Sequence, residues 1–132
     1  MTTLPTILPP YAALLALLFV YLSVRTIGTR RRLQIAIGDK DQPEMKRAMR
    51  VHANFAEYVP LGLVLLALVE SRSPAPWLVH ALCLCLLLGR ALHAYGVSQT
   101  KERFQFRVAG MMLTFACLVG SALFLLGSTF VA

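Results

Sequence analysis

Four long apolar stretches alternate along the chain with short segments that carry nearly all of its charge. No charged side chain occurs from Met1 to Val24, and further uncharged stretches run from Leu61 to Val69, from Ser73 to Gly89 and from Val108 to Ala132. With its flanking residues, each stretch reaches the ~20 residues that an α-helix needs to cross a bilayer. We therefore predict an all-α fold, an integral membrane four-helix bundle. Residues 1–132 form one domain, with spans at about 9–28, 44–70, 76–96 and 104–130.

The charged residues are few and unevenly placed. Of 132 residues, 58% are hydrophobic and 14% are charged, against about 25% charged in an ordinary soluble domain. Twelve of the thirteen Lys and Arg side chains lie between the first and second or the third and fourth apolar stretches, and Arg72 is the exception. The positive-inside rule places these two connections in the cytoplasm and both termini outside it. Topology therefore accounts for the net charge of +7, and we expect no nucleic-acid partner.

The cysteines and the N-terminus add no further class of site. Cys83, Cys85 and Cys117 lack C-x-x-C spacing, and we interpret them as small buried hydrophobic residues with no metal site. At the N-terminus, the positive charges follow the first apolar stretch instead of preceding it, which indicates an uncleaved first span. We expect a multi-pass protein, of the bacterial inner membrane, in contact with membrane lipid.

A polar stripe enters the second apolar stretch from its N-terminal side. At 100° per residue, Arg47, Arg50, Asn54 and Glu57 fall within about 80° of one helix face. Ionisable groups at membrane depth cost on the order of 2.5 kcal/mol or more each, so they persist mainly where they face a bundle interior or an aqueous cavity. Two interpretations remain open. The stripe is either a ligand site or a structural Arg50–Glu57 ion pair, with Asn54 hydrogen-bonded to another helix.

Two more helices bring polar groups to the same end of the bundle. Arg90 and His93 share a face near the end of the third span, and Arg103 and Arg107 share a face at the start of the fourth. That face continues through small and polar residues, namely Gly110, Thr114, Cys117 and Ser121. Several arginines with a carboxylate and an amide suit a polyanionic ligand that also carries an ammonium group. Glutathione fits this description, and an arginine beside its thiol would raise the thiolate fraction.

At these residues the sequence resembles the MAPEG family, the membrane-associated proteins in eicosanoid and glutathione metabolism. The family includes microsomal glutathione transferases, leukotriene C4 synthase and prostaglandin E synthase, and the likeness is greatest to its small bacterial-type members. The motifs that carry it are Arg50-x-x-x-Asn54-x-x-Glu57-Tyr58-x-Pro60, Gly89-Arg90-x-x-His93, Arg103-x-x-x-Arg107 and Arg30-Arg31. The resemblance covers essentially the whole chain.

The resemblance implies a homotrimer with glutathione bound as cosubstrate between neighbouring subunits near the cytoplasmic face. It implies a transferase or peroxidase that acts on a lipophilic small molecule, an electrophile. The residues implied to hold glutathione are Arg30, Arg31, Arg50, Asn54, Glu57, Tyr58, Arg90 and His93. Arg103 or Arg107 would stabilise the thiolate, and Arg103 aligns better with the activator of the synthase-type members.

One departure from the family pattern supports a second function. The better-known enzymes often carry a tyrosine one turn beyond the position of His93, and this chain has Val97 there. The alternative is therefore a non-catalytic protein that binds an anionic lipid or metabolite in the same pocket. A third class, the small four-helix drug exporters, depends on an acidic residue in the first span, and this span has none.

Overall fold

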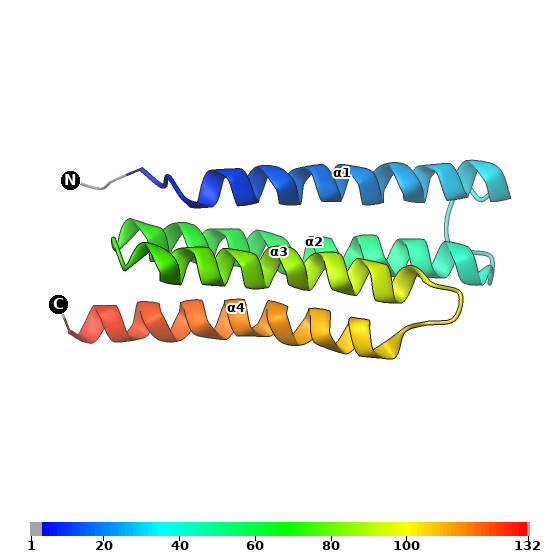
Figure 1. Ribbon diagram of the computed structural model, residues 1–132. Coiled ribbons are helices and arrows are strands. Elements are labelled where there is room, and N and C mark those ends of the chain that lie inside the picture. The colour runs from blue at the N-terminus through cyan, green and yellow to red at the C-terminus, as the bar shows by residue number, and fades with distance from the viewer. Residues whose placement is uncertain (1–3, 132) are drawn as a thin grey trace.

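The computed structural model describes residues 4–131 as four long helices, with no strand among these residues. The helices are α1 (Leu8–Leu33), α2 (Pro43–Ser71), α3 (Pro76–Ser98) and α4 (Phe104–Phe130). They run up and down, so that both ends of the described chain lie at one end of the bundle and the α1–α2 and α3–α4 loops at the other (Figure 1). All four are long and apolar enough to cross a membrane, which confirms the predicted fold class. Residues 1–3 and 132, which the single predicted domain includes, lie outside the described part.

Helix α1 continues beyond its predicted end at Gly28, as far as Leu33. Gln34 then adopts the left-handed conformation with φ of 53°, and the N–H of Ile35 donates to the Arg30 carbonyl at 2.9 Å. Nothing between Gly28 and Leu33 breaks a helix, and cations in the last turn interact favourably with the helix dipole. The three consecutive arginines that begin at Arg30 therefore lie on the helix and not in a loop.

The closest helix pair is α3 with α4, which make the most extensive contact in the bundle. A Cβ on Gly110 would lie 2.6 Å from the carbonyl oxygen of Gly89, so the two backbones touch at this point. The small and polar face predicted for α4 is buried from Gly110 to Ser121, as close helix contact in a bilayer favours. Helix α1 packs against α2 and α3, and no contact between its described residues and α4 occurs.

The N-terminus of α1 is held by a carboxylate from the far end of α2. Glu70 is 8% exposed. Its Oε1 accepts the backbone N–H groups of Thr6 and Ile7, each at 2.6 Å, and its Oε2 accepts that of Leu8 at 2.9 Å. Helix α1 has no side-chain cap of its own, so Glu70 satisfies donors that every helix start leaves open. Glu70 belongs to none of the sequence motifs, although it is the only acid at that end of the second helix.

We expect Glu70→Ala to lower the free energy of unfolding by about 1–3 kcal/mol, because three backbone N–H groups lose their acceptor. Thermal unfolding in detergent measures the effect. Glu44→Ala is the matched control, since the Glu44 side chain is 56% exposed and an exposed ion pair contributes about 0–1 kcal/mol. Equal melting temperatures for the two variants would contradict the anchoring role.

Candidate functional site

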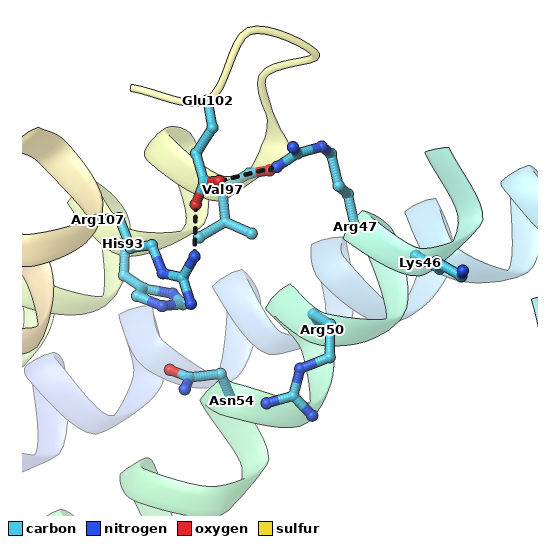
Figure 2. Close-up of a pocket in the computed structure, with 8 residues that line it drawn as sticks. All are labelled: Lys46, Arg47, Arg50, Asn54, His93, Val97, Glu102 and Arg107. Atoms are coloured by element: carbon cyan, nitrogen blue, oxygen red, sulfur yellow. Dashed lines mark hydrogen bonds and ion pairs between the residues drawn. The ribbon is translucent and has the colours of Figure 1, made fainter. Parts of the chain in front are cut away.

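A pocket of about 160 Å³ lies at the loop end of the bundle, between α2, α3 and the start of α4. The residues that line it come from all three helices and from the α3–α4 loop: Lys46, Arg47, Arg50, Asn54, His93, Val97, Glu102 and Arg107 (Figure 2). Four of the predicted site residues, Arg50, Asn54, His93 and Arg107, therefore meet in one cavity.

Arg90 lies beside this pocket without lining it. The side chain is 1% exposed, and each of its nitrogens has a partner within the bundle. Nη1 donates to Asn54 Oδ1 at 2.5 Å, Nε to Thr114 Oγ1 at 3.0 Å and Nη2 to Met111 Sδ at 3.2 Å. The guanidinium carbon also lies 5.6 Å from the centre of the Tyr58 ring. Arg90 thus fixes the orientation of Asn54 in the pocket wall and gives Tyr58 an aromatic contact.

The carboxylate of Glu102 is held between two arginines at the rim. Its Oε1 lies 2.7 Å from Arg107 Nη1 and its Oε2 lies 3.6 Å from Arg47 Nη1 (Figure 2). Arg47 Nη1 also donates to the backbone carbonyl of Val97 at 3.0 Å. The hydrogen bond from Arg107, aided by the charges of both arginines, holds the pKa of Glu102 below its usual range. Glu102 therefore stays ionised at neutral pH and is the anionic partner of Arg107, whose side chain is 49% exposed.

The Arg50–Glu57 pair occurs, but only weakly. Arg50 Nη1 and Glu57 Oε1 are 4.0 Å apart, and the side chains are 65% and 54% exposed. Exposed pairs of this kind contribute about 0–1 kcal/mol. Arg50 lines the pocket and Glu57 does not, so the ion-pair interpretation does not remove Arg50 from ligand binding.

Six of the predicted site residues do not line this pocket within one chain: Glu57, Tyr58 and Arg90 on α2 and α3, and Arg30, Arg31 and Arg103 elsewhere. Arg30 donates from Nη1 to the Gly38 carbonyl at 2.8 Å and shares a separate hollow with Arg31 at the end of α1. Arg103 directly precedes α4 and is exposed, with its guanidinium carbon 5.9 Å from the centre of the Phe106 ring. Of the two arginines considered for the thiolate, Arg107 lines the cavity and Arg103 does not.

Three residues that line the pocket are not among the predicted site residues. Arg47 lies on the predicted polar stripe but outside the family motifs, and Lys46 is one residue earlier. Glu102 was also overlooked, although it is the only acid in the second basic connection. That isolation was the available signal, because a lone carboxylate among arginines tends to pair with them.

An apolar hollow of about 210 Å³ opens between α1 and α2. Its walls are hydrophobic side chains and the ring of Pro60: Ala12, Leu15, Ala16, Phe19, Phe55, Ala56, Val59, Pro60 and Leu63. Pro60 lies inside the continuous helix α2, where it has no N–H to donate to the carbonyl four residues earlier. Pro60 thus forms part of the wall of this space between α1 and α2.

Comparison with known proteins agrees with this arrangement. The sequence profile of the MAPEG family matches residues 8–127 of this chain. Inner membrane protein YecN of Escherichia coli K12 is 35% identical over 109 residues, which are 83% of this chain and 82% of YecN. YecN of Escherichia coli O6:H1 has the same identity over the same share of each chain.

Proposed function

This chain belongs to the MAPEG family, and from that membership we propose a membrane-embedded, glutathione-dependent transferase or peroxidase that acts on lipophilic electrophiles. The observation that carries the proposal is the cationic pocket at the loop end of the bundle. Four cationic side chains and one carboxylate line it: Lys46, Arg47, Arg50, Arg107 and Glu102. Such an excess of positive charge suits the two carboxylates of glutathione, which arginine binds in bidentate fashion.

The size of the pocket supports a site shared between subunits. Its volume of about 160 Å³ lies below the ~300–1,000 Å³ typical of small-molecule sites. One chain therefore encloses only part of a tripeptide, and a second subunit would supply the remaining wall. Arg30 and Arg31 lie on another surface of the bundle, from which they would reach the pocket of a neighbour. We accordingly propose a homotrimer with glutathione bound between subunits.

In the transferase reaction, Arg107 would stabilise the thiolate. A free thiol has a pKa of about 8.5, which a neighbouring guanidinium lowers. The thiol proton passes to water, and the sulfur forms a bond to the electrophilic carbon while the leaving group departs with its electron pair. In the peroxidase reaction, the sulfur attacks one oxygen of a hydroperoxide, the O–O bond breaks and the alkoxide leaves and becomes the alcohol. A second glutathione thiol then attacks the sulfenic acid, which forms the disulfide and releases water.

The lipophilic substrate would approach from the bilayer. The apolar hollow beside Pro60 lies between α1 and α2 and has the chemistry to hold an acyl or aryl group. YecN is named an inner membrane protein, and we propose the same location here. The positive-inside rule then puts the pocket at the cytoplasmic side and both termini at the other.

The test is glutathione binding to the detergent-purified protein, with thiolate absorbance followed near neutral pH. We expect Arg50→Ala to weaken binding about tenfold, the loss of one charged hydrogen bond. We expect Arg107→Ala to lose thiolate signal more than binding. Arg103→Ala is the matched control, because Arg103 lies outside the pocket. Loss of the thiolate absorbance in Arg103→Ala alone would assign the activating role to Arg103. The absence of binding at millimolar glutathione would refute the proposed enzyme function.

The second candidate function is non-catalytic binding of an anionic lipid or metabolite. Val97 favours it, since this buried apolar side chain lines the pocket where the family resemblance expects a tyrosine. A valine has no hydroxyl to donate to a thiolate. Glutathione binding without ionisation of the thiol would support this candidate over the enzyme.

A further inference from the structure

Glu102 occupies the place in the pocket where an incoming anion would meet its strongest partners. Among the described residues, it is the only carboxylate that lines the cavity. Its two oxygens face different arginines, with Arg107 at 2.7 Å and Arg47 at 3.6 Å. Two cationic donors that converge on one carboxylate can bind the carboxylate of a ligand in the same way.

The side chain that holds this position belongs to a short loop. Gln99 to Arg103 connect α3 to α4, and Glu102 is joined to the bundle through its ion pairs with Arg47 and Arg107. Its side chain is 25% exposed, so water reaches the carboxylate and moderates the strength of both pairs. Glu102 therefore occupies both arginines in the absence of a ligand, and an anionic ligand can displace it.

We propose that Glu102 is a specificity-determining residue, an internal carboxylate that a ligand must displace from Arg47 and Arg107. The proposal rests on the anion-binding function above and goes beyond it. A ligand with one carboxylate only exchanges one ion pair for another. A ligand with a second anionic group gains an additional pair with Arg50, which lines the same pocket and has Glu57 only at 4.0 Å. Glu102 therefore imposes a cost on every anionic ligand, and only a dianionic ligand gains a further pair that offsets it.

Displacement of Glu102 also releases the loop. Lys101 and Arg103 flank Glu102 and are exposed, and both are cleavage sites for trypsin. A bound ligand that takes the arginines leaves the loop with fewer contacts, so trypsin would cut it faster. Most ligands protect their binding site from proteolysis, so faster cleavage on binding is a distinctive result.

The experiment compares wild type, Glu102→Gln and Glu44→Gln in detergent. Glu44→Gln removes the same charge from a more exposed glutamate that pairs with an arginine, Arg32. The probes are glutathione and its glycine monoethyl ester, which lacks one carboxylate. We expect Glu102→Gln to bind both probes about fivefold or more tightly than wild type, because neither probe then has to displace a carboxylate from Arg47 and Arg107. We also expect rapid trypsin cleavage at Lys101 and Arg103 without ligand in this variant, and ligand-accelerated cleavage in wild type and Glu44→Gln.

The outcomes separate this inference from the proposed function. If wild type binds glutathione and Glu102→Gln binds it equally or more weakly, the inference is overturned and the function stands. If wild type binds no glutathione, the proposed function fails. The inference is then tested by comparing the rate of trypsin cleavage in inorganic sulfate with the rate in chloride of equal ionic strength. Faster cleavage by sulfate in wild type and not in Glu102→Gln would support it, and unchanged cleavage would overturn it. Glu102→Asp, which keeps a shorter carboxylate, should give intermediate affinity, and thermal unfolding confirms that each variant is folded.

Discussion

Replacing Gly110 with alanine is expected to force α3 and α4 apart and to lower the free energy of unfolding by about 1–3 kcal/mol or more. A Cβ at this position would lie 2.5 Å from the backbone nitrogen of His93 and 2.6 Å from the carbonyl oxygen of Gly89. Both are backbone atoms, so no change of rotamer relieves the contact. Separation of the helices would also move His93 relative to Arg107 and reduce ligand binding. Thermal unfolding and glutathione binding of the detergent-purified variant measure the two effects.

Gly127→Ala is the matched control on the same helix. A Cβ at Gly127 would meet nothing within 4 Å, and alanine is favoured over glycine inside a helix by about 1 kcal/mol. We therefore expect Gly127→Ala to be neutral or slightly stabilising. Equal melting temperatures for the two variants would show that the α3–α4 contact tolerates a methyl group and would contradict the packing described here.

Replacing Arg90 with alanine is expected to have the second large effect, a loss of about 3 kcal/mol in the free energy of unfolding. The guanidinium is fully enclosed, and its removal leaves a cavity and takes away the donors to Asn54 Oδ1 and Thr114 Oγ1. Thr114 keeps its own hydrogen bond to the Gly110 carbonyl at 2.8 Å. The larger loss is therefore the hydrogen bond to Asn54 Oδ1. Thermal unfolding in detergent measures the loss, and the exposed Arg72→Ala serves as the control.

A second variant separates the structural role of Arg90 from its role in the site. Methionine fills a volume close to that of arginine without a charge, and such replacements of buried charges are often neutral for stability. We expect Arg90→Met to melt closer to wild type than Arg90→Ala and still to bind glutathione at least tenfold more weakly, because Asn54 is no longer oriented. Wild-type affinity in Arg90→Met would contradict the positioning role.

The sequence by itself determined the number of helices and the faces on which their polar groups lie. Length and apolarity identified four spans, and the 3.6-residue period put Gly110, Thr114, Cys117 and Ser121 on one face, which the structure buries. The same period placed Arg50 and Asn54 on one stripe, and both line the pocket. The cytoplasmic orientation, the homotrimer and the role of glutathione remain predictions, since they depend on a membrane, a partner and a ligand.

Only the tertiary structure decided which polar group faces the pocket and which one supports it. Arg90 and Arg107 look alike in the sequence, but Arg90 is enclosed against Asn54 and Thr114 whereas Arg107 reaches Glu102. Periodicity orders residues around one helix, but it does not determine the rotation and depth of that helix against its neighbours. Those depend on packing between segments far apart in the chain, such as the contact of Gly110 with α3. The hydrogen bonds from the start of α1 to Glu70 of α2 were likewise decided by the tertiary structure. No local sequence pattern links a carboxylate to backbone groups that lie on a different helix.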